Sequence, residues 1–486
     1  MRSKRHWLFL VVLAGVFLRL WHLTRLSFWC DEAEAVFLGS LSVPEMLRFI
    51  VTQDAHPPLF YLLVHQMLKL GQGDLWLRLL PALAGLACLP TGWFLARKML
   101  DEEGAFFFLL LLTFSPVHIL WSQVLKSYSL FSLFGLASSI LFLKCPGENK
   151  RSIFLLWLSD LLLLYLHHYS VFFILAQFLT LFLLRKLSRG WLVFFALLFL
   201  AWIPWLIYLP GQIAYTSAII RRIPQWLRWP YFFFYTVLGE TVSPFNLTVV
   251  VPAALFSLAG WWSGFWRWKN LVREQGVYLL LVALLPLVVI PFRSTLPQNL
   301  VPFTTFWYLM LAAGAKTNWK STAAFCGVLI CMIVSVSFYH AGVASQFHDI
   351  SRLAPFREIG RFLTEQAGEN DIIITNEDRK WVNGRPVSIF DRYYQGKAAV
   401  LAVRPEDGPI ERLDQRVQPY KGVWLLQTYA GEEPWNMKLR QHFTGKFVLV
   451  EAREYLRNER WLERIKTGQR SYYYYLTLCH FTRKGR

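Results

Sequence analysis

The sequence predicts a polytopic α-helical membrane protein of about eleven transmembrane helices, followed by a small extracytoplasmic α/β domain. Three observations predict this class. Hydrophobic residues make up 55% of the 486 residues and charged residues only 17%, whereas a typical soluble domain has about 25% charged residues. The apolar residues are gathered in runs of about 20, the length that crosses a bilayer as a helix. Basic residues form short clusters between these runs, which is typical of membrane proteins.

The formal net charge of +19 does not indicate a nucleic-acid partner. Residues 1–340 carry 26 Lys and Arg against 13 Asp and Glu, and residues 341–486 carry 24 against 18. The larger excess therefore lies in the apolar part of the chain, where the predicted partner is the lipid bilayer. The six cysteines form no CxxC pair, so the sequence indicates neither a zinc site nor a disulfide framework.

The expected spans begin with the apolar run 7–26, which follows Arg2, Lys4 and Arg5. No small-residue cleavage pattern follows this run, so we expect an uncleaved first span and a cytoplasmic amino terminus. Residues 27–74 are too polar to cross the bilayer, and we expect a first external loop with short helices along the membrane surface. The further spans that complete a transmembrane domain over 1–340 are expected at 75–96, 104–121, 127–143, 153–168, 169–185, 190–209, 245–266, 276–292, 299–315 and 321–340.

The basic clusters test this layout from within. We number the turns between consecutive expected spans along the chain. Each cluster falls at an even-numbered turn, on the same side of the membrane as the amino terminus. We therefore expect a multi-pass protein of the cell (plasma or inner) membrane. The clusters are Arg97/Lys98, Lys144/Lys150/Arg151, Arg185/Lys186/Arg189, Arg267/Lys269/Arg273 and Lys316/Lys320.

The C-terminal part, residues 341–486, has short apolar runs in place of long ones. It is expected outside the cytoplasm. A helix-like stretch over 356–367 is followed by short apolar runs separated by Gly and Pro, which indicate strands and turns. We expect a small α/β domain with strands over 371–375, 399–403, 423–427, 447–450 and 472–477.

Polar residues that are not in the basic clusters gather at the odd-numbered turns, on the outer side. They include two carboxylates, three histidines and two cations at one level, an arrangement suited to a reaction chamber at the outer leaflet. The candidates are Asp31, Glu32, His56, Gln123, Lys126, Tyr128, His167, His168, Tyr169 and Arg293.

Several of these candidates also have an ordinary structural explanation, and His56 before two prolines could be an ordinary loop residue. Asp31 and Glu32 could cap and charge the start of a surface helix. Lys126 could extend its ammonium to the lipid headgroups. The pair His167 and His168 could be interfacial residues, as Trp and Tyr often are.

The motifs resemble those of GT-C fold glycosyltransferases, in particular bacterial relatives of the protein O-mannosyltransferases and of the lipid A aminoarabinose transferase. The resemblance covers about the first 200 residues well and the remainder in general layout. Its motifs are specific to the superfamily but not to the sugar. They are residues 29–33 (Trp-Cys-Asp-Glu-Ala), 56–61 (His-Pro-Pro-Leu-Phe-Tyr), 77–81 (Leu-Arg-Leu-Leu-Pro), 115–118 (Ser-Pro-Val-His), Ser122-Gln123, Lys126, Tyr128 and His168-Tyr169.

The resemblance implies inverting transfer of a sugar from a polyprenyl-phosphate donor to a lipid, glycan or protein acceptor outside the cytoplasm. The first-loop acid of the family corresponds to Asp31. Two positions depart from the family pattern. Lys126 stands where the family often has Arg, and Gln298-Asn299 stands where Arg-Tyr is common; Arg293 is the candidate replacement for the second cation.

This chemistry assigns a role to each candidate. Asp31 would act as the general base on the acceptor hydroxyl, and Glu32 would orient Asp31, bind acceptor hydroxyls or share a cation. Lys126, Arg293 and the histidines would stabilise the departing phosphate. A divalent metal ion held by Asp31 could do the same work, and the sequence leaves this choice open.

Two other function classes remain open. The first is a secondary transporter or lipid flippase, for which Asp160, inside an apolar run, and Glu240 are the candidate midplane charges. The second is an inactive glycolipid-binding scaffold, which the departure at Gln298-Asn299 favours.

Overall fold

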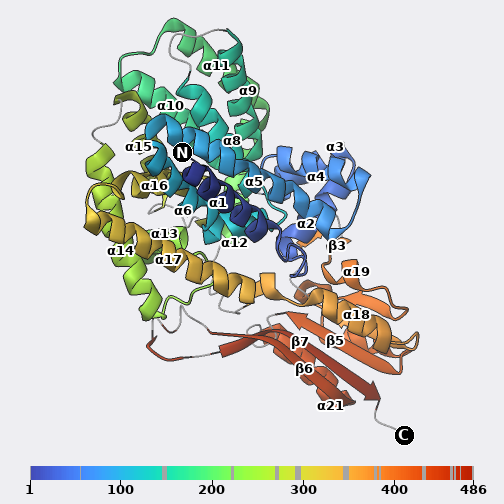
Figure 1. Ribbon diagram of the computed structural model, residues 1–486. Helices are drawn as coiled ribbons and strands as arrows, with labels where there is room; N and C mark the ends of the chain where they lie inside the picture. Colours follow the sequence, from blue (N-terminus) through green and yellow to red (C-terminus); the bar gives the residue numbers. More distant parts are fainter. Residues whose placement is uncertain are drawn as a thin grey trace. The chain divides into compact units, whose positions relative to one another are not determined.

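The structure is a computed structural model, and it divides into two compact units (Figure 1). Residues 1–23 and 38–343 form the first, and residues 24–37 and 344–486 form the second. The first part of the expected loop 27–74, residues 27–37, groups with the C-terminal residues. The structure describes residues 2–54, 56–144, 150–219, 224–268, 273–290, 297–342, 350–376, 380–382, 385–428, 434–459, 464, 467–470 and 472–483.

The first unit is helical throughout its described residues, apart from turns. Helix α2 (Cys30–Ser40) begins in the second unit and ends in the first. The further helices are α1 (Arg2–Leu20), α3 (Val43–Gln53), α4 (Leu59–Leu70), α5 (Asp74–Met99), α6 (Glu102–Thr113), α7 (Pro116–Ser122), α8 (Tyr128–Phe142), α9 (Lys150–Leu166), α10 (Val171–Leu183), α11 (Arg189–Leu206), α12 (Leu209–Ile219), α13 (Gln225–Leu238), α14 (Leu247–Trp268), α15 (Arg273–Val289), α16 (Val301–Gly314) and α17 (Trp319–Ala341), with the 3₁₀ turns η1 (His168–Ser170) and η2 (Pro297–Leu300).

The expected span over 104–121 is broken in the structure. Helices α6 and α7 meet at an angle of 55°, with Phe114 and Ser115 between them. Pro116 cannot donate a backbone hydrogen bond, so the helix ends before it. The Ser115 hydroxyl then accepts from the His118 backbone N–H at 3.3 Å, which caps the new helix.

Among the described residues, four helices are long and apolar enough to cross a bilayer: α5, α11, α14 and α17. The bent pair α6–α7 makes a fifth if it is one span. Other expected spans appear as shorter apolar helices, including α8 and the stretch from His168 to Leu183. The total of about eleven crossings stays a prediction.

Ion pairs within the first unit join turns that the expected order of spans places on the same side of the membrane. The Lys316 ammonium lies 2.5 Å from Asp101 and 2.8 Å from Glu103, and Lys186 lies 2.6 Å from Glu274. Both pairs connect even-numbered turns. The ammonium of Lys316 also holds the pKa of the Asp101 carboxyl below its ordinary value.

Helices α14 and α16 approach closely because glycines line their contact. Gly260 and Gly264 lie one turn apart on α14, and Gly314 ends α16. A Cβ atom on Gly264 would lie 2.0 Å from the Met310 carbonyl oxygen, and one on Gly314 would lie 2.7 Å from the Gly260 carbonyl oxygen. Small residues at such a spacing let helix backbones pack together in a membrane.

The second unit contains a five-stranded mixed sheet in the order β4-β1-β5-β7-β6. Strands β1 and β4, and β1 and β5, are parallel, whereas β7 is antiparallel to β5 and β6. The strands are β1 (Asp371–Thr375), β4 (Ala399–Ala402), β5 (Gly422–Thr428), β6 (Phe447–Glu459) and β7 (Tyr472–Arg483). The small mixed-sheet domain that we expected at the C-terminus is thereby confirmed.

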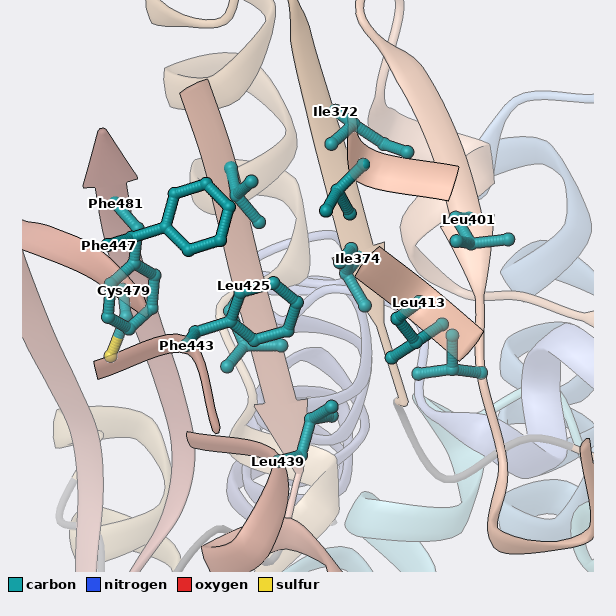
Figure 2. Close-up of a cluster of buried hydrophobic side chains, with 13 residues drawn as sticks. Ile372, Ile374, Leu401, Leu413, Leu425, Leu439, Phe443, Phe447, Cys479 and Phe481 are labelled. Atoms are coloured by element: carbon teal, nitrogen blue, oxygen red, sulfur yellow. The ribbon is translucent and has the colours of Figure 1, made fainter. Parts of the chain in front are cut away.

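Helices cover both faces of this sheet. On one face, alternate residues of β1, β5 and β7 pack against Leu439 and Phe443 of α21 (Pro434–Lys446) and against α20 (Leu413–Val417), as Figure 2 shows. On the other face the Phe362 ring of α18 (Phe356–Gln366) lies 5.8 Å from the Trp424 ring. Successive side chains of a strand point to opposite faces of the sheet. Because helices cover both faces, the central strands are buried on both sides.

Some elements differ from the sequence expectation. Strand β6 continues to Glu459 and bulges between Leu449 and Glu451. A short hairpin of β2 (Lys380–Val382) and β3 (Arg385–Val387) was not expected. The added part of β6 is polar, with Glu and Arg alternating among few apolar residues, and β2 and β3 have only three residues each, so neither gives a clear strand pattern in the sequence.

Gly264→Ala should destabilise the first unit because the added methyl group would overlap the backbone of α16. Overpacking of this kind costs about 1–3 kcal/mol, and we expect a lower midpoint of thermal unfolding in detergent. Gly211→Ala on α12 is the matched control, because its Cβ would meet nothing within 4 Å. Equal midpoints for the two variants would contradict the close packing of α14 and α16.

Candidate functional site

Four residues from turns that the sequence predicts on the outer side meet in the first unit, and we call them the polar cluster: His56, Tyr128, His167 and Asn299. The ring centroid of His167 lies 5.7 Å from that of His56 and 5.8 Å from that of Tyr128. The Tyr128 hydroxyl donates to Asn299 Oδ1 at 3.3 Å, and the Asn299 amide also lies beside His167. Four odd-numbered turns, far apart in sequence, therefore meet at one place.

His167 is held by the break between α9 and α10. The chain leaves α9 at Leu166, and the Tyr169 backbone N–H donates to His167 Nδ1 at 3.1 Å. Since an N–H can only donate, Nδ1 is the acceptor and the proton of the neutral ring is on Nε2. The Phe131 ring stacks on the imidazole with centroids 4.7 Å apart. The tautomer and the plane of His167 are both set by these contacts.

The other two histidines are tied to buried polar side chains. His56 Nδ1 lies 3.1 Å from Asp54 Oδ1, and the carboxylate of Asp54 is buried. His168 Nε2 lies 2.9 Å from Gln212 Oε1. The Gln212 amide nitrogen donates to the Ile50 carbonyl at 3.0 Å and to the His56 carbonyl at 3.4 Å. Gln212 therefore links the first loop to the turn that carries His168.

Lys126 and Tyr169 lie at the edge of the polar cluster. Lys126 comes from the turn between α7 and α8, is buried, and lies close enough to His167 to act on its charge. The Tyr169 ring lies 5.6 Å from that of His167. Lys126 thus adds an ammonium group to the N–H and O–H donors of the polar cluster. Groups of both kinds bind phosphate oxygens.

Gln123 has a structural role in the first unit. Its amide nitrogen donates to the carbonyls of Leu18, Arg19 and Trp21 at 3.1, 3.1 and 2.9 Å. Its amide oxygen accepts from the Tyr339 hydroxyl at 2.7 Å. The side chain therefore satisfies the last carbonyls of α1, which have no partner within the helix.

Asp31 and Glu32 lie in the second unit, in the first turn of α2. Glu32 is buried, and its carboxylate accepts from the Trp29 backbone N–H at 3.4 Å. This is the helix-start interaction that the sequence left open for the pair. Asp31 is partly exposed, and the Cys30 sulfur lies 3.9 Å from its Oδ1. Its catalytic role stays a prediction, as does a cavity shared with His56, Lys126 and His168.

The remaining candidate, Arg293, lies outside the described residues. Three residues of the cluster and its surroundings were not expected from the sequence: Asp54, Gln212 and Asn299. Asp54 could have been found as a carboxylate two residues before His56. Asn299 had been noted as a departure from the family pattern, and the structure places that departure beside Tyr128 and His167.

A metal site was left open by the sequence. Within the described part of the chain, no three His, Cys, Asp or Glu side chains are grouped so that they could hold a metal ion.

The architecture defines the class of the protein: the chain has the GT-C fold and is an integral membrane protein. The likeness that shows this fold is to ArnT from Cupriavidus metallidurans in the apo state, with a TM-score of 0.57 at 11% identity over 98% of both chains. The same ArnT bound to undecaprenyl phosphate gives 0.55 at 13% identity, again over 98% of both chains.

A further solved structure is the arabinofuranosyltransferase AftD from mycobacteria. It gives a TM-score of 0.46 at 13% identity, over 99% of this chain and 40% of AftD. At the level of sequence, no family model matches the chain and no curated protein matches it significantly. The fold expected from the motifs is confirmed, and the identities are too low to carry an activity across.

Proposed function

We propose that the protein is a membrane glycosyltransferase that moves a sugar from a polyprenyl-phosphate donor to a lipid, glycan or protein acceptor. The polar cluster carries this proposal, because it gathers donors for a phosphate at helix ends. The fold supports it, since ArnT, with the same fold, has been solved with undecaprenyl phosphate bound. A carrier phosphate lies at headgroup depth, where the ends of transmembrane helices also lie.

The proposed reaction is a single displacement with inversion. Asp31 removes the proton of the acceptor hydroxyl while the hydroxyl oxygen bonds to the anomeric carbon. The bond from that carbon to the phosphate oxygen breaks at the same time, and polyprenyl phosphate departs with the negative charge. Lys126 and the N–H and O–H donors of the polar cluster stabilise this charge as it develops.

The proposed reaction takes place outside the cytoplasm, at the cell membrane, with the amino terminus inside. The basic clusters at even-numbered turns support this orientation through the positive-inside rule. The C-terminal domain then lies on the same side as the odd-numbered turns.

A transporter or flippase is the second candidate, and a specific network favours it. Asp160 is fully buried among helices α8, α9 and α10. It accepts from the Ser138 hydroxyl at 2.5 Å and from the Gln177 amide at 3.2 Å. Ionisable groups buried within membrane helices often serve transport. The third candidate, an inactive glycolipid-binding scaffold, is favoured by Asn299 in the polar cluster.

One experiment separates these candidates. The purified protein is reconstituted in liposomes with labelled polyprenyl-phosphate sugars and with lipid, glycan and protein acceptors, with and without a chelator. Transfer of label to an acceptor supports the glycosyltransferase. Movement of the labelled lipid between leaflets without transfer supports a flippase, and binding without either supports a scaffold.

Asp31→Asn should lower sugar transfer by at least about a hundredfold, since general-base catalysis contributes about 10²–10⁴-fold. Membrane insertion, abundance and the thermal midpoint should stay as in the unchanged protein. Glu102→Gln, an exposed carboxylate in the first turn of α6, is the control. Normal transfer by Asp31→Asn would remove Asp31 from the active site.

Lys126→Ala should lose more activity than Lys126→Arg, because the proposed role of Lys126 depends on its positive charge. The loss should appear as a raised KM for the lipid donor together with a lower kcat. Lys144→Ala, at the exposed end of α8, is the matched control. Equal losses in the Ala and Arg variants would count against contact with phosphate.

A further inference from the structure

The C-terminal domain holds the segment that carries Asp31. Residues 21–29 connect the end of α1 to the start of α2, and residues 24–29 of this connection group with the C-terminal residues in the second unit. Ser27, Phe28 and Trp29 are buried there. A connection of this length between two helices would be mobile without tertiary contacts, so its contacts decide where α2 begins.

Three hydrogen bonds fasten this connection to the C-terminal domain. The Arg357 guanidinium donates to the Thr24 carbonyl at 2.7 Å. The Arg357 backbone N–H donates to the Ser27 hydroxyl at 3.0 Å. The Phe28 backbone N–H donates to the Tyr393 hydroxyl at 2.8 Å. The first two come from the start of α18 and the third from the end of α19 (Phe390–Tyr393).

Arginine–aromatic pairs reinforce the same contact. The Arg392 guanidinium lies 4.5 Å from the centre of the Phe28 ring, and that of Arg352 lies 4.6 Å from the centre of the Trp29 ring. Arg357 lies 5.3 Å from the centre of the Tyr393 ring. Contacts of this kind are strongest where the groups are shielded from water.

The contact is transmitted to Asp31 through a short, hydrogen-bonded path. Trp29 directly follows the fastened Phe28. Its carbonyl accepts from the backbone N–H of Glu32 and of Ala33, both at 3.0 Å, and its own N–H donates to the Glu32 carboxylate. Asp31 lies inside this first turn, so its backbone cannot shift without breaking these bonds.

We propose that the C-terminal domain is a positioning domain for Asp31, with Arg357 and Tyr393 as its positioning residues. This inference rests on the proposed function of Asp31 as the base. The two residues do not take part in the chemistry. They set the place from which the carboxylate reaches the acceptor hydroxyl, and a displacement of about 1 Å in such a group can cost a hundredfold in rate.

The neighbouring pair Tyr393 and Tyr394 provides a matched test. Tyr393→Phe removes the hydroxyl that accepts from the Phe28 N–H. Tyr394→Phe removes a hydroxyl that donates to the Ala398 carbonyl at 3.2 Å, within the C-terminal domain. We expect Tyr393→Phe to lower kcat by about tenfold or more with the donor KM unchanged, and Tyr394→Phe to leave both unchanged.

The native thiol of Cys30 gives a second readout that needs no activity. Cys30 is partly exposed and directly precedes Asp31. In the full-length protein, its alkylation by a maleimide is followed by peptide mass spectrometry. Because the fastening bond is lost, we expect alkylation about fivefold or more faster in Tyr393→Phe than in Tyr394→Phe.

Arg357 tests whether the cation itself is required. Arg357→Lys keeps the charge and a donor, whereas Arg357→Met keeps only the apolar stem. Compared with the unchanged protein, we expect Arg357→Lys to retain most of the kcat and the slow alkylation of Cys30, and Arg357→Met to retain neither. Both variants should retain the thermal midpoint of the first unit if they fold.

The outcomes separate this inference from the proposed function. Faster Cys30 alkylation together with a lower kcat in Tyr393→Phe supports positioning. A change in one readout without the other, or no difference from Tyr394→Phe, overturns it. If the unchanged protein transfers no sugar to any acceptor, the proposed function fails, while the alkylation rates still report whether the C-terminal domain orders the Asp31 segment.

Discussion

The structure of the first unit depends on one constraint: the hydrocarbon core offers no water to a backbone group that leaves a helix. At two described helix ends of this unit, a side chain supplies hydrogen bonds that the helix itself lacks. Gln123 does so for the carbonyls at the end of α1. Ser115 does so at the break between α6 and α7, where the Tyr308 hydroxyl lies 2.8 Å from it and also donates to the Thr236 carbonyl.

The same constraint explains where the candidate site lies. A helix that stops at the membrane surface releases side chains from the regular packing of the bundle, and these side chains can then point toward a headgroup. His167 stands at the break between α9 and α10, where its Nδ1 accepts from the Tyr169 backbone N–H and its ring lies beside those of His56 and Tyr128. The residue that follows the end of α9 and accepts a backbone hydrogen bond there is therefore also a residue of the polar cluster.

The second unit shows a different way of fixing a segment that carries a candidate side chain. Its sheet has a continuous apolar core on the side of α20 and α21, and residues of α18 and α19 contact a segment from far earlier in the chain. That segment is residues 24–37, which precede the domain by more than three hundred positions in the chain. The segment that carries Asp31 is joined to residues 344–486 by Arg357 and Tyr393.

The sequence by itself determined the membrane class and the positions of the five main strands, while the side of the membrane on which each turn lies stays a prediction. These properties depend on hydropathy, charge and a two-residue alternation, all of which are local. It also indicated His56, Tyr128, His167 and His168 as members of one group, because alternation of spans places odd-numbered turns together.

The tertiary structure decided what depends on long-range pairing. Pro116 could be seen in the sequence, but the 55° bend of α6 and α7 follows from how the broken helix finds partners on α16. Gln212 and Asn299 enter the cluster from distant segments without a spacing signal. The grouping of residues 24–37 with the C-terminal domain was likewise hidden, since no local pattern records which surface a connecting segment will pack against.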